Sequence, residues 1–226
     1  MGNHAVLLSW SGGKDAAWTL HHLQRSGMQV TGLITTLTSG YERVSMQGIR
    51  RSILHAQAAA TRLPLIEVEI PPGCDNATYE AAFASGLQQA GERWPGLHTI
   101  TFGDLLLQGI RDYRVALCSH FGWEVETPLF GSDTRQLARE MQAGGLKASL
   151  CCVDTQQLSA DYAGRDFDAS LLHDLPTGVD PCGENGEFHT CVQAGPMFEH
   201  PLMIERGETV LRDSRFTYTD FDIENP

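Results

Sequence analysis

The sequence has no apolar run long enough to cross a bilayer. The run from Ala5 to Leu8 is far shorter than the roughly 20 residues that a membrane-spanning helix needs. No charged leader precedes a long apolar segment near the N-terminus, as a secretory signal would require. We therefore expect a cytoplasmic protein that does not enter a membrane.

Positive charge is scarce. The chain has 16 Lys and Arg against 28 Asp and Glu, which gives a formal net charge of -12 at pH 7. Binding to a phosphate backbone usually needs clustered basic side chains, so we do not expect a nucleic-acid partner. The 42% of hydrophobic residues is ordinary for a globular chain, so all 226 residues are expected to fold.

Cysteine pairs of the CxxC type are also missing. We expect reduced thiols, because the cysteines have no regular spacing. Cys151 and Cys152 are adjacent, so on a strand they would point to opposite faces, which favours burial over metal binding by the pair. The six cysteines are Cys74, Cys118, Cys151, Cys152, Cys182 and Cys191.

Strand and helix patterns alternate along the first two thirds of the chain. This alternation predicts right-handed βαβ units and an α/β fold with a parallel, doubly wound sheet. After about residue 155 the pattern becomes mixed, so we predict two regions, residues 1–154 with the parallel sheet and residues 155–226 with a smaller α+β structure. Strands are predicted at 4–9, 30–36, 65–70, 97–102 and 148–153, helices at 15–24, 49–63, 77–93, 108–121 and 133–143, and in the second region a helix at 168–172 and β runs at 188–193 and 209–218.

A glycine-rich turn joins the first predicted strand to the first helix. The chain contains neither GxxxxGK[ST] nor GxGxxG, and has Ser9-Trp-Ser-Gly-Gly-Lys-Asp15 instead. Backbone N–H groups at a helix N-terminus favour an anion, and the paired glycines let the backbone approach a phosphate closely. Lys14 can neutralise phosphate charge, Ser11 can donate a hydrogen bond, and Asp15 can hold Mg²⁺. The alternative is a plain turn with Asp15 as a helix cap.

Two further clusters carry polar side chains. Asp104 follows the strand predicted at 97–102, with Arg111 and Arg114 on the next helix, where a parallel sheet binds ligands; a helix cap with solvated arginines is the alternative. Residues 180–190 combine carboxylates, an amide, an imidazole and a hydroxyl between glycines, which suits a shared substrate site. A surface turn, or a zinc site, is the alternative there. The zinc ligands would be Cys182, His189 and Cys191, but no fourth ligand has finger-like spacing.

Three motifs resemble known families. SGGKD at 11–15 resembles the pyrophosphate-binding loop of the ATP pyrophosphatases, also called adenine nucleotide alpha hydrolases. FGD at 102–104 with YR at 113–114, and GENGEFHT at 183–190, are similar to motifs of the diphthine ammonia ligase family. The resemblance runs from Val6 to about Leu202 and implies the HUP-type fold of that superfamily. Two positions depart from the family pattern: Ala16 stands where Ser is common, and Met46-Gln47-Gly48 where His often precedes the glycine.

The resemblance implies a reaction. ATP and Mg²⁺ would activate an acceptor carboxylate as an acyl-adenylate, and ammonia would then displace AMP. In the family the acceptor is diphthine, a modified histidine of elongation factor 2; a small metabolite stays open here, as does a homodimer. We expect the nucleotide to contact Ser9, Ser11, Gly12, Gly13, Lys14, Asp15, Leu33, Thr35, Gly103, Asp104 and Arg114. The expected catalytic residues are Lys14, Asp15, Glu184, Glu187 and His189, and Asp15 is expected to bind the metal. Substrate contacts are expected from Glu184, Asn185, Glu187, His189 and Thr190.

Two other functions use the same nucleotide site. A sulfur transferase acting on tRNA would need a pair of catalytic cysteines and a basic docking surface. A nucleotide-binding sensor without turnover is the other alternative, and the Ala16 departure allows it. Measuring pyrophosphate or AMP release separates the sensor from the ligase.

Overall fold

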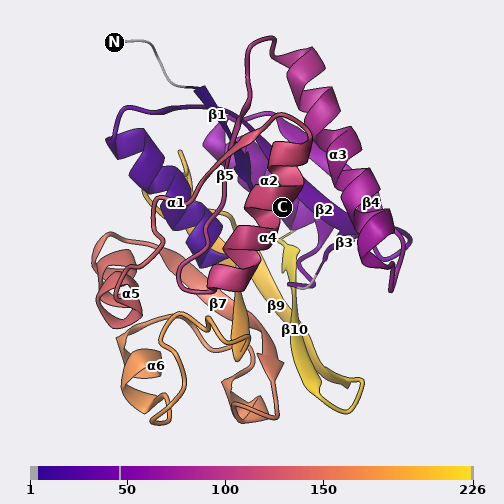
Figure 1. Ribbon diagram of the computed structural model, residues 1–226. Helices are drawn as coiled ribbons and strands as arrows, with labels where there is room; N and C mark the ends of the chain where they lie inside the picture. The colour runs from indigo at the N-terminus through magenta and orange to yellow at the C-terminus, as the bar shows by residue number, and fades with distance from the viewer. Residues whose placement is uncertain (1–4, 46, 225–226) are drawn as a thin grey trace.

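The computed structural model describes residues 5–45 and 47–224 and contains two sheets (Figure 1). The first sheet has six strands and is mostly parallel, as predicted. Strand β1 lies in the middle, with β2 on one side and β5 then β6 on the other; β4 pairs in parallel with the far side of β2, and only the two-residue β3 is antiparallel. The strands are β1 (Ala5–Ser9), β2 (Gln29–Thr38), β3 (Arg43–Val44), β4 (Leu65–Ile70), β5 (Thr99–Thr101) and β6 (Glu124–Glu126).

Helices cover both faces of this sheet because its strand residues are apolar on both sides. In β1, Val6 and Leu8 join the core cluster that contains residues of α1 and α2, whereas Leu7 joins the cluster that contains residues of α3 and α4. Alternate residues of a strand point to opposite faces, so three consecutive apolar residues serve two cores. The helices are α1 (Lys14–Arg25), α2 (Arg51–Thr61), α3 (Asn76–Arg93) and α4 (Gln108–His120).

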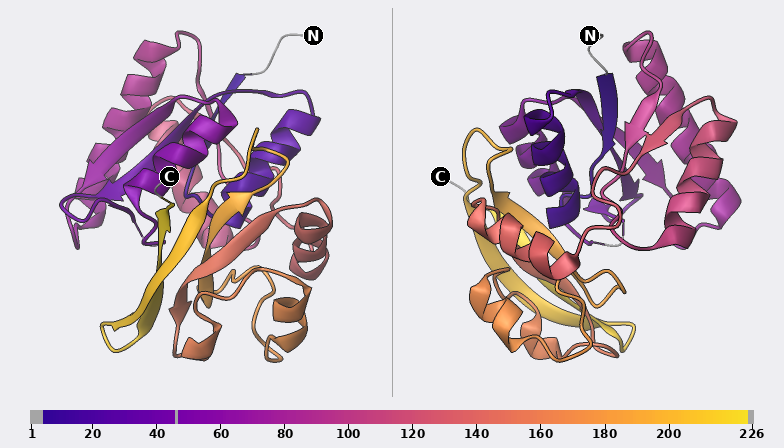
Figure 2. Two further views of the ribbon diagram at one scale, coloured as in Figure 1. Left: turned by 180° about the vertical axis from the view of Figure 1, so that it is seen from behind. Right: turned by 60° about the vertical axis from the view of Figure 1, so that its left-hand side comes forward.

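The second sheet is antiparallel and packs beyond α1 and α2. Its order is β8-β7-β10-β9, and residues of β7 and β8 share the core cluster of α1 and α2. Figure 2 shows the helices α5 and α6 beside this sheet. The elements are α5 (Thr134–Ala143), β7 (Lys147–Asp154), the 3-10 turn η1 (Ala160–Tyr162), α6 (Ala169–Asp174), β8 (Phe188–Ala194), β9 (Ile204–Arg212) and β10 (Phe216–Ile223).

Three details differ from the sequence-based expectations. The strand expected at 148–153 is β7, and it pairs with β8 and β10 rather than extending the parallel sheet. The β run expected at 209–218 is interrupted, because Asp213 and Ser214 have positive φ angles of 51° and 52° and form the turn between β9 and β10. The short β6 was not predicted. The domain boundary predicted between residues 154 and 155 stays a prediction. Strand β7, which precedes this boundary in the sequence, belongs to the second sheet.

Within residues 5–45 and 47–224, no helix has the combination of length and apolar content needed to cross a bilayer.

Candidate active site

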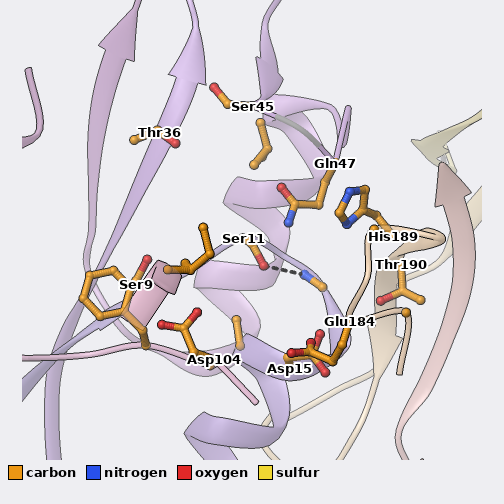
Figure 3. Close-up of a pocket in the computed structure, with 18 of the residues that line it drawn as sticks. Ser9, Ser11, Asp15, Thr36, Ser45, Gln47, Asp104, Glu184, His189 and Thr190 are labelled. Carbon is orange, nitrogen blue, oxygen red and sulfur yellow. Dashed lines mark hydrogen bonds between the residues drawn. The ribbon is translucent and has the colours of Figure 1, made fainter. Parts of the chain in front are cut away.

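A cavity of about 930 Å³ opens at the carboxyl ends of β1 and β5 (Figure 3). The chain leaves β1 toward α1 on one face of the sheet and leaves β5 toward α4 on the other. Ligands of open α/β sheets bind at such a point of divergence. The opposite wall comes from the second sheet and from the loop at 182–190. The site is therefore built from segments more than 170 residues apart in the sequence.

The turn predicted to bind phosphate lines this cavity. Ser9, Ser11 and the segment from Gly13 to Ala16 face it, and the Ser11 hydroxyl accepts a hydrogen bond from the N–H of Gly13 at 3.3 Å. In the view of Figure 3, Asp15 and Glu184 lie below the Ser11 hydroxyl, and Ser45 and Gln47 lie above it. Both departures from the family pattern, Ala16 and Gln47, line the cavity, whereas Met46 lies outside the described residues.

Gly12 supports the turn from behind rather than lining the cavity. Its φ angle is +78°, and a Cβ there would lie 2.7 Å from Oε1 of Gln57. Gln57 is fully buried: its Nε2 donates to the carbonyls of Gly12 at 3.0 Å and Val192 at 2.8 Å, and its Oε1 accepts from the indole of Trp10 at 3.0 Å. A buried amide with three satisfied partners fixes the turn against β8. Sequence reasoning missed Gln57, because nothing local marks a glutamine in a helix as a clamp.

Helix α1 begins without a side-chain cap of its own. Its N-cap residue is Gly13, and the N–H of Lys14 donates instead to the Thr190 hydroxyl of β8 at 3.0 Å. By contrast, α3 and α5 are each capped by the aspartate that precedes them. The open first turn of α1 therefore presents N–H groups and the positive end of the helix dipole at the cavity wall. Asp15 is not the helix cap of the alternative reading, because it lies inside the helix.

Lys14 and Asp15 form the charged centre of the site. The side chain of Lys14 is buried, and its Nζ donates to both carboxylate oxygens of Asp15, at 2.9 and 2.8 Å, and to the carbonyl of Cys182. Burial lowers the pKa of Lys14, but Asp15, together with Cys182 and Glu184, more than offsets this, so the pKa lies above its ordinary value. The ammonium is therefore held in its charged form at the turn.

Glu184 lies beside this pair and has a raised pKa. Burial, reinforced by the Asp15 carboxylate, raises the pKa of Glu184 to about 7. Its Oε2 accepts a hydrogen bond from the N–H of Leu106 at 3.1 Å, which orients the carboxyl group across the cavity mouth. A carboxyl group that titrates near neutrality is suited to proton transfer.

The rest of the predicted substrate cluster is divided between two places. Asn185, His189 and Thr190 line the cavity, and burial lowers the pKa of His189 to about 4, so its imidazole is neutral at pH 7. Glu187 does not line it: the side chain is 2% exposed and accepts from the N–H groups of Asp180 at 2.8 Å and Asn185 at 2.9 Å. These contacts make Glu187 the internal brace of the loop that carries Glu184.

Asp104 and Arg114 meet on the α4 side of the cavity. Arg114 donates to Oδ1 of Asp104 and stacks over the ring of Phe102 with 4.5 Å between guanidinium carbon and ring centroid. The other carboxylate oxygen of Asp104, Oδ2, is buried and has no hydrogen-bond partner in the described part of the chain. Arg111 turns away from this pair and donates to the Thr127 hydroxyl at 2.9 Å.

Gly103 makes the close approach of β5 to the phosphate turn possible. A Cβ at Gly103 would lie 2.9 Å from the carbonyl carbon of Asp15 and 3.0 Å from the amide nitrogen of Ala16. Gly103→Ala is therefore expected to displace the first turn of α1 and to weaken nucleotide binding by ~10-fold, about 1.4 kcal/mol. Calorimetric titration with a nucleotide measures this. Gly109→Ala is the control, because a Cβ there meets nothing within 4 Å, and equal affinities of the two variants would contradict the prediction.

One end of the cavity is apolar. Leu33 is buried in the core and Thr35 lines the cavity, so of these two residues, both expected to contact the nucleotide, only Thr35 reaches it. Neighbouring side chains that the sequence did not single out complete this wall. They are Ile34, Ile70, Tyr79, Phe83 and Phe102, with the rings of Tyr79 and Phe83 stacked at 5.9 Å.

Acidic side chains slightly outnumber basic ones around the cavity. The lining includes three basic residues, Lys14, Arg114 and Arg215, and four acidic ones, Asp15, Asp104, Asp154 and Glu184. A polyphosphate in such a cavity needs an added cation. No group of three or more metal-binding side chains exists among residues 5–45 and 47–224, so a cage of protein ligands does not form. A magnesium ion bound mostly through phosphate oxygens, with one or two carboxylates such as Asp15 or Asp104, does fit.

Burial disfavours the thiolate form of the two cysteines nearest the loop at 182–190. All six are free, and burial raises the pKa of Cys182 and of Cys191 to about 12. The Cys182 thiol donates to the carbonyl of Thr134 at 3.3 Å. The expected burial of Cys151 and Cys152 is confirmed, at 3% and 2% exposure.

Comparisons with known proteins point in one direction. Residues 133–221 match a family model described as the diphthamide synthase C-terminal domain. A curated diphthine–ammonia ligase from Schizosaccharomyces pombe is 24% identical to this chain over 221 residues. That match covers 90% of this chain and 36% of the yeast protein, so the chain spans about a third of that relative's length.

Proposed function

Because both comparisons support the diphthine ammonia ligase family, we propose that this chain is an ATP-dependent ligase that forms a C–N bond. In the proposed reaction an acceptor carboxylate is adenylated and then amidated by ammonia, with release of AMP and pyrophosphate. The observation that carries the proposal is that the N-terminal turn of α1 and the loop containing Glu184 line the same cavity.

The cavity suggests a position for each part of ATP. The triphosphate would lie along Ser11 to Asp15, where the N-terminus of α1 and the Lys14 ammonium favour an anion. The adenine would occupy the apolar end beside Thr35, between Ile34 and Phe83. Magnesium, held by Asp15 or Asp104, would neutralise phosphate charge that Lys14 leaves unbalanced.

The proposed chemistry has two steps. First, a carboxylate oxygen attacks the α-phosphorus, the bond to the bridging oxygen breaks, and pyrophosphate leaves while Lys14 stabilises its charge. Second, the nitrogen of ammonia attacks the acyl carbon, AMP leaves with the bonding electrons of the acyl C–O bond, and the nitrogen gives up one proton to the phosphate of the departing AMP. Glu184, with a pKa of about 7, takes a proton from ammonium to generate the nucleophile. His189 stays neutral and can accept a hydrogen bond from the acceptor or the amine.

AMP formation tests this proposal. The protein is incubated with Mg-ATP, ammonium and a fractionated metabolite pool, and AMP and pyrophosphate are followed by mass spectrometry. We expect AMP to appear only with an acceptor fraction, and the mass of the acceptor to shift from that of the carboxylic acid to that of the slightly lighter amide. Tight ATP binding without AMP in any fraction would favour the sensor without turnover instead.

A further inference from the structure

The second sheet contributes an arginine to the cavity that the proposed reaction does not yet use. Arg215 is the first residue after the Asp213–Ser214 turn, and it lines the cavity together with Phe216. Both residues of that turn have positive φ angles, which fixes where the next side chain points. The side chain of Arg215 is 43% exposed.

A buried carboxylate holds this arginine in one orientation. Asp154 is 1% exposed, and its two oxygens accept from Nε of Arg215 at 2.9 Å and from Nη2 at 2.7 Å. Gln157 adds a third hydrogen bond to Asp154 at 3.0 Å, and the guanidinium carbon lies 4.8 Å from the ring centroid of Phe216. A guanidinium has five N–H donors, and Asp154 takes two of them. Three donors remain without a partner among the described residues.

The loop that carries Glu184 lies between this arginine and the phosphate turn at 11–15. At one end of the loop, the carbonyl of Cys182 accepts from Lys14 Nζ. At the other end, the carbonyl of Asn185 accepts from Gln157, which also bonds Asp154, the partner of Arg215. Glu184 lies between these two contacts. A cationic group is therefore linked to each end of this loop, with the proposed proton acceptor between them.

From this arrangement, and resting on the proposed ligase function, we infer that Arg215 binds a second anionic group of the acceptor. The acceptor would then carry two acidic groups: one carboxylate that is adenylated near Lys14, and a carboxylate or phosphate that pairs with the free edge of the Arg215 guanidinium. Asp154 is the positioning residue. An acceptor with a cationic group in that place would be repelled by Arg215.

Ligand titration with the nucleotide site filled tests the inference. The protein is saturated with Mg²⁺ and α,β-methylene-ATP, whose α–β link is not cleaved, and binding is measured by calorimetry. The probes are α,ω-dicarboxylates of three to seven carbons, the phosphonocarboxylates and monocarboxylates of matching length, and 4-trimethylammoniobutyrate. We expect at least one dianion to bind ~10-fold or more tightly than its monocarboxylate, and the cationic probe to bind more weakly. The better of the two dianion types identifies the second group.

Variants connect this preference to one side chain. Arg215→Met should abolish the dianion preference and leave the affinity for α,β-methylene-ATP within about twofold, since one charge-assisted contact is lost from the acceptor alone. Arg212→Met is the matched control, because Arg212 lies on the same hairpin, is exposed and does not line the cavity. Arg215→Lys keeps a cation beside the buried Asp154, so it replaces Arg215→Met in the test if that variant fails to fold. It should lower the preference for dianions over monocarboxylates at least ~3-fold.

Several results would overturn the inference. Equal affinity of the wild-type protein for dianions and monocarboxylates is one, and an equal loss in the Arg212 and Arg215 variants is another. Loss of nucleotide affinity in Arg215→Lys would assign the arginine to ATP. If the wild-type protein binds no α,β-methylene-ATP at all, the proposed ligase function itself fails, which separates the two outcomes.

Discussion

Replacing Lys14 by methionine is expected to reduce AMP formation by about three orders of magnitude, since preorganised charge at a leaving group contributes on the order of 3–4 kcal/mol. Lys14 is 2% exposed and sits at the N-terminus of α1, with its ammonium against Asp15 and the Cys182 carbonyl. Methionine fills a similar volume without the charge. Pyrophosphate would then leave without its cationic partner, and nucleotide affinity should fall as well. Both are measured, by AMP release and by titration with α,β-methylene-ATP.

The chain provides its own control for this variant. Its other lysine, Lys147, is exposed at the start of β7 and does not line the cavity. Lys147→Met removes the same charge and should keep full turnover. Thermal unfolding of both variants shows whether Lys14→Met is folded, because Asp15 loses its ion-pair partner there. A folded Lys14→Met protein with full AMP production would contradict the assignment of the phosphate site.

The parts of the site that could be predicted are those with a local signal. Apolar residues at both 6 and 7 indicate a strand buried on two faces, and the SGGKD turn follows that strand directly. The strand order then places Gly103 and Asp104 next to the turn, as expected for the carboxyl edge of a parallel sheet. Local pattern and general topology together suffice for these positions.

Contacts between distant segments could not be predicted in the same way. Gln57 lies 135 residues from Val192, and Thr190 lies 176 residues from Lys14, yet these pairs hold the phosphate turn in place. Arg215 follows a turn made of two non-glycine residues with positive φ, and the sequence does not predict this turn. The sequence alone does not show which side chains of these distant segments meet.

The polar side chains of the loop at 180–190 do not all face the cavity. Glu187 and His189 are two residues apart on a strand pattern, which suggests one shared face. The structure places His189 in the cavity lining, whereas both oxygens of Glu187 accept hydrogen bonds within the loop. Backbone N–H groups in a tight turn need acceptors, and the nearest carboxylate supplies them. We therefore propose that Glu187 positions Glu184 and does not touch the substrate.

Replacing Glu184 by glutamine is expected to reduce turnover by ~10²–10³-fold while nucleotide binding is kept, in the range of lost general-base catalysis. Burial raises the pKa of Glu184 to about 7, so the wild-type rate should rise with pH up to that value and level off above it. The Glu184→Gln variant should lose the levelling-off near pH 7, because its rate then follows the fraction of free ammonia, which keeps rising with pH. Glu205→Gln, an exposed change on β9 outside the cavity, should keep the wild-type profile. An unchanged profile in Glu184→Gln would assign the titration to another group.

The same shift predicts an effect on stability. Because the folded-state pKa of Glu184 lies above its ordinary value of 4.5, the folded protein holds this proton more tightly than the unfolded chain does. The stabilisation is therefore complete below about pH 4.5 and is lost as the pH rises through about 7. Glutamine cannot ionise, so the melting temperature of Glu184→Gln should fall less between pH 5 and 8 than that of the wild type. The ionised form of this carboxyl group lowers the stability of the folded protein, yet it is the form needed for turnover. Such a compromise between stability and activity is expected of a catalytic base. An equal fall in melting temperature with pH in both proteins would contradict this role, because it would mean that Glu184 titrates as an ordinary surface carboxyl.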